Sequence, residues 1–258
     1  MSRVYDWNGG DIKSRSITDK KTNYTWALNS RLPDAILPGT GRAENGKMEV
    51  RELPATSILP ACLEAEVNVT LGTLELKRVF RIFPDCPAIS CTFYLRGSSS
   101  GPWFENTPAA TDARPATTIM EQLTVPGKHW RLRSVQFYDV TDRNNSLVQT
   151  YDQLLYRNES RLVGNLLFAD EVLSDHGLFI LKEAPTSTVQ LASPGFDFLA
   201  KAGSIQTAGL GVIPADLDPK EWTRCYGFVT GVTSGGELGR LSALRTYQKM
   251  VRKHENGR

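Results

Sequence analysis

A regular alternation of apolar and polar side chains constrains the fold of this chain more than any other feature. In residues 63–69 every second side chain is apolar, and acidic or amide side chains stand between them. Gly72 interrupts the alternation, which resumes in residues 74–82. A period of two places neighbouring side chains on opposite faces of a strand, so each segment predicts a half-buried strand. Together they predict a β-hairpin, and residues 89–95 predict a third strand.

The same kind of pattern continues along most of the chain. Turn residues separate the segments, for example Ser-Asp-His-Gly at 174–177 and Pro-Gly at 194–195. The further predicted strands lie at 130–140, 147–156, 161–172, 177–183, 189–191, 204–212 and 223–232. A dozen or so strands without intervening helices predict an all-β fold, a two-layer antiparallel β-sandwich. Its 258 residues suit a single large β domain.

The C-terminal segment is where the period changes to that of a helix. Apolar residues recur at helical spacing at Leu238, Leu241, Leu244 and Tyr247, with Val251 one turn further on. Ser234 and Glu237 have the spacing of a capping box, which predicts the start of the helix. We therefore divide the chain into a β-sandwich domain at 1–233 and a C-terminal helix at 234–258. We expect the sandwich to cover the apolar stripe of this helix only in part.

Residues 97–126 have four prolines and little periodicity, which predicts a long loop. Long loops in compact domains often have a function of their own. Trp103 and Phe104 lie in this segment, and they are our candidates for contact with a carbohydrate or with another domain. The alternative is that they only attach the loop to the sandwich. The four other tryptophans lie at or near strand patterns, where burial in the core is expected.

The sequence has few groups that could carry out chemistry. It contains no glycine-rich nucleotide loop, no nucleophile elbow and no zinc-protease motif. Two acidic clusters, Asp170 with Glu171 and Asp139 with Asp142, are the available carboxylate pairs for glycoside cleavage, but strand ends normally carry solvated acids. We expect His176 to lie in a turn exposed to solvent. We therefore expect no catalytic residue, no cofactor and no metal site in this chain.

The cysteines, the net charge and the N-terminal segment limit which partners and which compartment the sequence allows. Cys62, Cys86, Cys91 and Cys225 lack the spacing of metal ligands and predict reduced, buried thiols. A net charge of +2 gives no field that would recruit nucleic acid or an anionic membrane. The polar start of the chain is unlike a secretory signal. The compartment stays open between the cytoplasm and, if a signal has been removed, the periplasm or the cell exterior.

Four segments resemble a known domain. They are residues 5–28 (YDWNGGDIKSRSITDKKTNYTWAL), 156–198 (YRNESRLVGNLLFADEVLSDHGLFILKEAPTSTVQLASPGFDF), 209–232 (GLGVIPADLDPKEWTRCYGFVTGV) and 236–258 (GELGRLSALRTYQKMVRKHENGR). They are similar to the N-terminal β-supersandwich domain of the α-galactosidase-like enzymes of glycoside hydrolase family 36, in the galactose-mutarotase-like fold group. In that family the C-terminal helix leads into a (β/α)8 barrel, and the two catalytic aspartates lie on the barrel. The resemblance therefore implies no catalytic position within this chain.

Three functions remain to be compared. The first is an accessory domain of an α-galactosidase-like hydrolase, which supports the catalytic barrel, the rim of its cleft or oligomer contacts. The second is a freestanding module that binds carbohydrate, and the third is a small enzyme similar to aldose epimerases. The mutarotases of the fold group use histidines with a glutamate, and no matching motif occurs here. The terminal helix favours the first function, with the barrel, an α-galactoside or a second copy of the chain as partners.

Overall fold

The computed structural model describes residues 1–99, 117–127, 129–137, 148–187, 190 and 194–251. Within these residues the chain forms 16 strands in three sheets and one long helix. Every strand pair in the three sheets is antiparallel. The prediction of an all-β antiparallel sandwich with a C-terminal helix is confirmed.

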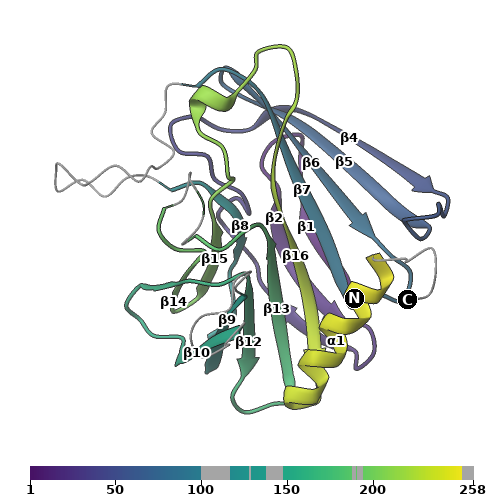
Figure 1. Cartoon of the computed structure of the whole chain (residues 1–258), viewed down its shortest axis with the longest axis vertical. Helices are drawn as coiled ribbons and strands as arrows, with labels where there is room; N and C mark the ends of the chain where they lie inside the picture. The colour runs from purple at the N-terminus through teal and green to yellow at the C-terminus, as the bar shows by residue number, and fades with distance from the viewer. Residues whose placement is uncertain (100–116, 128, 138–147, 188–189, 191–193, 252–258) are drawn as a thin grey trace.

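The largest sheet has nine strands and forms one layer of the molecule (Figure 1). From edge to edge its strands are β10 (Val148–Leu154), β9 (Trp130–Phe137), β12 (Leu166–Glu171), β13 (His176–Glu183), β16 (Thr223–Ser234), β7 (Ala88–Gly97), β6 (Leu74–Ile82), β5 (Cys62–Leu71) and β4 (Glu44–Leu53). The predicted hairpin is confirmed as β5 and β6, in which Leu63 pairs with Ile82. The third predicted strand is β7, which pairs with β6.

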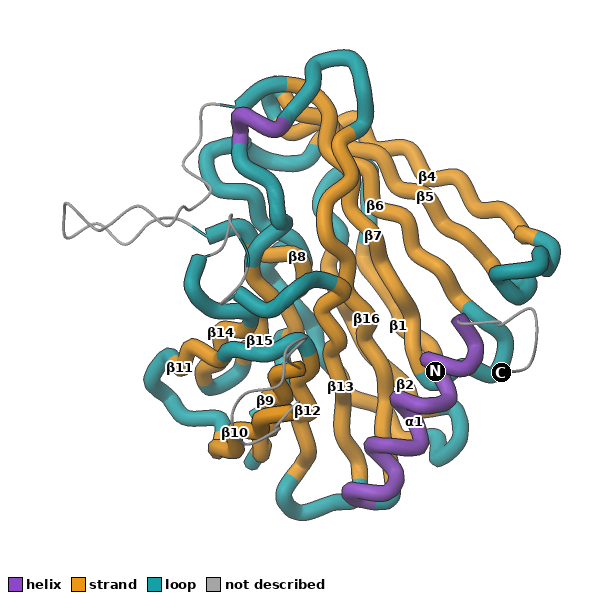
Figure 2. Tube along the Cα trace, viewed as in Figure 1, coloured by secondary structure: helices purple, strands orange, loops and turns teal. Residues whose placement is uncertain are grey.

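Two smaller sheets form the other layer. One contains β1 (Ser2–Asp6), β2 (Lys13–Asp19) and β3 (Tyr24–Ala27), and the other contains β11 (Ser160–Leu162), β14 (Phe198–Lys201), β15 (Ser204–Ala208) and β8 (Ile119–Leu123). Apolar side chains from both sheets pack against the inner face of the nine-stranded sheet in two buried clusters. A short 3-10 helix, Pro214–Asp216, precedes β16. Figure 2 shows that strands make up much of the described chain and that α1 is its one long helix.

Six strands lie where the side-chain pattern did not predict them: β1, β2, β3, β4, β8 and β14. β8 lies inside the predicted 97–126 loop, and all five of its residues are buried, so it has no alternation to detect. Its two central polar residues, Glu121 and Gln122, are buried among the sheets rather than exposed. β4 is an edge strand whose side chains are almost all exposed, so it has no apolar face. β14 spans only four residues, too few for a periodic signal.

The helix α1 (Gly236–Val251) lies on the outer face of the nine-stranded sheet, across β13 and β16 (Figure 1). The predicted capping box is wrong, because Ser234 is the last residue of β16 and pairs with His176. The chain turns into the helix at Gly235 and Gly236, which have φ values of +85° and +65°. Glycine adopts this left-handed conformation without the steric cost of a Cβ atom. Strand pairing thus continues through the residue that the sequence assigned to the helix cap.

Candidate functional site

The outer face of the nine-stranded sheet has an apolar core of its own beneath α1. Leu244 and Tyr247 of the helix are 8% and 3% exposed, and they belong to one buried cluster with Phe168, Phe179 and Val229 of the sheet. Burying a leucine side chain in full stabilises the fold by about 1.5–3 kcal/mol. The C-terminal half of α1 is therefore part of the folded domain, and its removal would uncover the sheet.

The N-terminal half of α1 presents the same apolar stripe to solvent. Leu238 is 81% exposed and Leu241 is 50% exposed. The turn between β12 and β13 lies next to this half, because Gly235 N donates a hydrogen bond to Asp175 O at 2.9 Å. Within that turn Leu173 is 86% exposed. We name Leu238, Leu241 and Leu173 the apolar α1 patch, an exposed surface at the start of the helix.

Ion pairs fix the exposed half of the helix on the sheet. Arg240 of α1 forms an ion pair with Asp170 of β12, and Glu237 accepts a hydrogen bond from Arg133 of β9 at 3.2 Å. Burial raises the pKa of Asp170, although Arg240 acts in the opposite direction. Since both pairs tie the patch to neighbouring strands, the exposed leucines are presented on a positioned helix rather than a free one.

A cleft of about 1030 Å³ adjoins the other side of α1. The helix contributes Ser242, Ala243 and Thr246 to its lining, and the turn between β6 and β7 contributes Phe83 and Asp85. The cleft and the apolar α1 patch thus both border the same helix.

The two neighbouring acids at the end of β12 cannot act as a catalytic pair. Asp170 faces the outer side of the sheet, where it contacts Arg240, because strand side chains alternate. Glu171 faces the interior and accepts hydrogen bonds from Trp26 Nε1 and Tyr24 Oη, both at 2.8 Å. Glu171 is 5% exposed, so the expectation of a solvated acid is wrong at this position. The other candidate pair, 139 with 142, lies outside the described residues.

The structure tests some of the other residues that the sequence analysis singled out and leaves two of them untested. Trp103 and Phe104 lie outside the described residues, so their proposed role stays a prediction. His176 is the first residue of β13 rather than a solvated turn residue, and its ring stacks on Tyr24 with the centroids 3.9 Å apart. Trp26 and Trp130 are each 1% exposed, which confirms their expected burial, whereas Trp7 and Trp222 are only partly buried. All four cysteines are buried and free, as predicted: Cys62, Cys86, Cys91 and Cys225.

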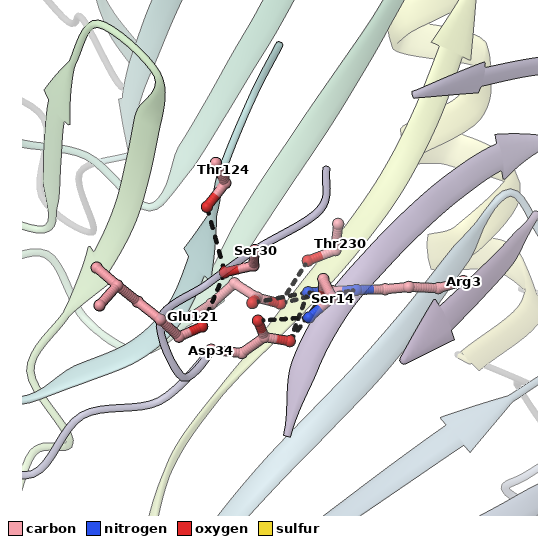
Figure 3. Close-up of polar contacts among 8 residues, drawn as sticks. Arg3, Ser14, Ser30, Asp34, Glu121, Thr124 and Thr230 are labelled. Atoms are coloured by element: carbon pink, nitrogen blue, oxygen red, sulfur yellow. Dashed lines mark hydrogen bonds and ion pairs between the residues drawn. The ribbon is translucent and has the colours of Figure 1, made fainter. Parts of the chain in front are cut away.

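A buried cluster of charges connects the two small sheets (Figure 3). Arg3 of β1 donates from Nη1 to Glu121 Oε2 at 2.5 Å and from Nη2 to Glu121 Oε1 at 2.8 Å. Its Nη2 also lies 3.3 Å from Asp34 Oδ2. Ser14 binds Asp34 through its backbone N–H and its hydroxyl group, at 2.9 and 2.6 Å. Because both carboxylates are 0% exposed, the cluster is structural and not a carboxylate pair that a substrate could reach.

A polar groove of about 400 Å³ lies at the β10 edge, on the inner face of the nine-stranded sheet. Tyr151 of β10 pairs with Ser134 of β9 and is 62% exposed. Gln136, Gln149 and Gln153 also line the groove. The Nε2 atom of Gln153 is buried and has no hydrogen-bond partner. Amide groups beside an aromatic ring form the kind of surface that binds sugars, since hydroxyl groups need donors and acceptors and sugar rings stack on aromatic faces.

The described residues contain neither a candidate metal site nor a helix that could span a membrane. No group of three histidine, cysteine, aspartate or glutamate residues in the described part of the chain is placed to hold a metal ion. Among the described residues, no helix has the length and apolar character needed to cross a membrane.

The comparisons with known proteins place the fold. The galactosidase domain of the α-galactosidase–sucrose kinase AgaSK is similar over 93% of this chain, with a TM-score of 0.52 and 11% identity. A family 36 α-galactosidase AgaA from Geobacillus stearothermophilus, in complex with stachyose, is similar over 96% of this chain, with a TM-score of 0.52 and 10% identity. The α-galactosidase from Lactobacillus brevis is also similar over 96% of this chain, with a TM-score of 0.50 and 10% identity. No protein-family profile and no curated sequence matches the chain.

The similarity extends over a limited part of these larger enzymes. This chain spans 34% of the AgaSK chain, 41% of the AgaA chain and 36% of the Lactobacillus brevis chain. The chain therefore has the fold of a β-sandwich portion of family 36 α-galactosidases, at a sequence identity too low to transfer an activity. The likeness agrees with the sequence resemblance, which rests on residues at both ends of the chain.

Proposed function

We propose that this chain is the non-catalytic N-terminal domain of an α-galactosidase-like glycoside hydrolase, and that it supports the catalytic barrel. The observation that carries the proposal is the half-covered helix at its C-terminal end. Leu244 and Tyr247 are buried on the sandwich, whereas Leu238 and Leu241 face solvent. An amphipathic helix with an exposed apolar stripe needs a further covering layer. The limited coverage of the similar α-galactosidase chains supports a barrel as that layer.

In this proposal the barrel packs on the apolar α1 patch and the adjoining cleft. Glycoside cleavage requires two carboxyl groups at a defined separation, and the barrel would supply them. The sandwich would hold the barrel in position, and it could also shape the rim of the substrate cleft or contact a second copy of the enzyme. An α-galactoside would then reach this domain only where it borders the cleft.

The first test reads the gene beyond codon 258. A continuous reading frame that encodes a (β/α)8 barrel supports the proposal, and a stop codon there contradicts it. In the longer protein, Leu238→Ser combined with Leu241→Ser should lower the melting temperature and the activity. The matched control is Arg245→Gln, at an exposed position of the same helix that belongs neither to the apolar α1 patch nor to the lining of the cleft. If the double variant behaves as the control does, the patch is not the contact with the barrel.

The polar groove at β10 favours a second candidate, a freestanding carbohydrate-binding module. Tyr151 and the unpaired Nε2 of Gln153 are the groups that would contact a sugar. Isothermal titration of the isolated chain with galactose, raffinose and stachyose tests this candidate. Saturable binding that Tyr151→Ala abolishes and Tyr156→Ala preserves would support it, because Tyr156 is also exposed but does not line the groove. Absence of binding would leave the accessory-domain proposal as the better account.

A further inference from the structure

A further pocket, open to solvent on one side, lies between the layers, away from α1 and from the groove at β10. Its volume is about 570 Å³, within the usual range of small-molecule sites. Segments 31–37 and 40–43 line one side, and the inner face of β5 and β6 lines the other. The apolar part of that inner face consists of Val67, Val69, Leu71 and Leu76. One charged side chain, Arg78 of β6, stands on the same face.

Arg78 is buried, and its guanidinium group is held in a fixed place. The residue is 4% exposed, and its Cζ atom lies 4.9 Å from the ring centroid of Phe80 and 5.3 Å from that of Phe93. Phe80 follows two residues later on the same face, and Phe93 is the direct partner of Arg78 on β7. Two aromatic rings thus hold the planar cation by cation–π contacts.

Two nitrogens of Arg78, Nε and Nη2, are buried without a hydrogen-bond partner. These two atoms form one edge of the guanidinium group, with parallel N–H bonds that match the two oxygens of a carboxylate or phosphate. The buried carboxylates of Asp34 and Glu121 attract Arg78 electrostatically, but their hydrogen bonds from an arginine come from Arg3. A buried donor without an acceptor carries a cost of about 1–3 kcal/mol, and more when it is charged. A further acceptor is therefore expected at this edge.

The charge of the cavity lining favours an anion as that acceptor. Besides Arg78, the lining includes Lys13, Arg31 and Arg42, against one acid, Asp11. Arg31 and Arg42 are exposed, so they lie at the mouth rather than in the interior. Basic groups at the mouth of a cavity with apolar walls raise the local concentration of anions.

We propose that this cavity binds a small organic oxyanion, a carboxylate or a phosphate monoester, whose two oxygens bind Nε and Nη2 of Arg78. The remainder of the ligand lies against the valine and leucine side chains of β5 and β6. A molecule about the size of an acidic or phosphorylated monosaccharide fits the volume. The proposal does not depend on the accessory-domain function, because the cavity and the apolar α1 patch lie on opposite faces of the nine-stranded sheet.

The experiment is isothermal titration of the purified chain with three probes: galacturonate, galactose 6-phosphate and neutral galactose. We expect saturable binding of one or both anions and no binding of galactose, which has the same ring without the charge. The anion that binds identifies the source of the oxyanion. Equal binding of galactose, or no binding of either anion, would overturn the proposal.

The variant Arg78→Lys keeps the positive charge but loses the pair of parallel N–H donors of the guanidinium group. It should therefore weaken anion binding by at least about tenfold. The matched control is Arg81→Lys on the same strand, since Arg81 faces the outer side and binds Glu64. Unchanged affinity in Arg78→Lys contradicts the proposal. If Arg78→Lys does not fold, crystals of the unchanged protein soaked in galacturonate and in galactose 6-phosphate decide the question. An anion on Nε and Nη2 supports the site, and water alone overturns it.

Discussion

Arg3 of β1 and Glu121 of β8 form a two-point ion pair that joins the two small sheets, with side chains that are 1% and 0% exposed. The partners are 118 residues apart in sequence. Thr230 of β16 donates a further hydrogen bond to Glu121 at 3.3 Å, so the pair also contacts the nine-stranded sheet. A single buried contact therefore links all three sheets of the sandwich.

We predict that Glu121→Gln destabilises the domain by about 3–5 kcal/mol, because it removes the two-point carboxylate partner of Arg3 and leaves the buried charge with the single contact to Asp34 at 3.3 Å. Urea denaturation measures the free energy of unfolding. The control is Glu75→Gln, whose partner Arg96 is 31% exposed, and which should cost about 0–1 kcal/mol. Equal effects of the two substitutions would contradict the structural role of the buried pair.

Two leucines of α1 should differ in how much stability is lost when the side chain is shortened to alanine. Leu244→Ala should destabilise the isolated chain by about 2–5 kcal/mol, because its side chain is part of the outer core. Leu238→Ala should change the free energy of unfolding by no more than about 0.5 kcal/mol, since the side chain faces solvent. Thermal or urea unfolding of both variants measures the difference. A large loss at Leu238 would mean that the isolated domain already covers the patch.

The buried thiols should make stability depend on alkaline pH. Burial raises the pKa of Cys91 to about 11 and that of Cys225 to about 12, whereas an unfolded cysteine titrates near pH 8.5. A raised folded pKa gives stability that is present in full below the unfolded pKa and is lost as the pH rises toward the folded pKa. The free energy of unfolding, measured with urea, should therefore decline from about pH 8.5 upward. The decline should be smaller in the variant with Cys91→Ala and Cys225→Ala.

The same burial protects the thiols from reagents. At neutral pH we expect slow reaction of Cys91 and Cys225 with a disulfide reagent in the folded protein, because the reactive thiolate is scarce. Denaturation without a reductant should release four titratable thiols. Fewer than four would reveal a disulfide and contradict the reduced state.

We predict that the isolated chain does not hydrolyse aryl α-galactosides above a buffer blank. Asp170 and Glu171 face opposite sides of their strand, and Asp34 and Glu121 are sealed around Arg3. Turnover that disappears in a single aspartate or glutamate variant would show a catalytic pair within this chain. Turnover that persists in every such variant would instead point to a contaminating enzyme.

Local pattern was enough to predict the main elements of the fold. The alternation around Leu63 and Leu74 predicted the β5–β6 hairpin, because a strand at a sheet surface imposes a period of two on its side chains. The spacing of Leu244 and Tyr247 predicted the helix and its buried face. The start of the helix was placed two residues early, because Ser234 is held in β16 by pairing with a strand far away in sequence.

The sequence by itself determined that this protein is an antiparallel β-sandwich with one amphipathic helix, since side-chain periodicity is a local property. Only the tertiary structure decided what its polar residues do. β8 is buried on both faces and so carries no periodic signal, and its Glu121 meets Arg3 through long-range packing. The same holds for Arg78, because the two aromatic rings and the cavity that surround its guanidinium group come together only in the folded structure. Contacts between distant segments depend on how the layers stack, and no window of sequence encodes that stacking.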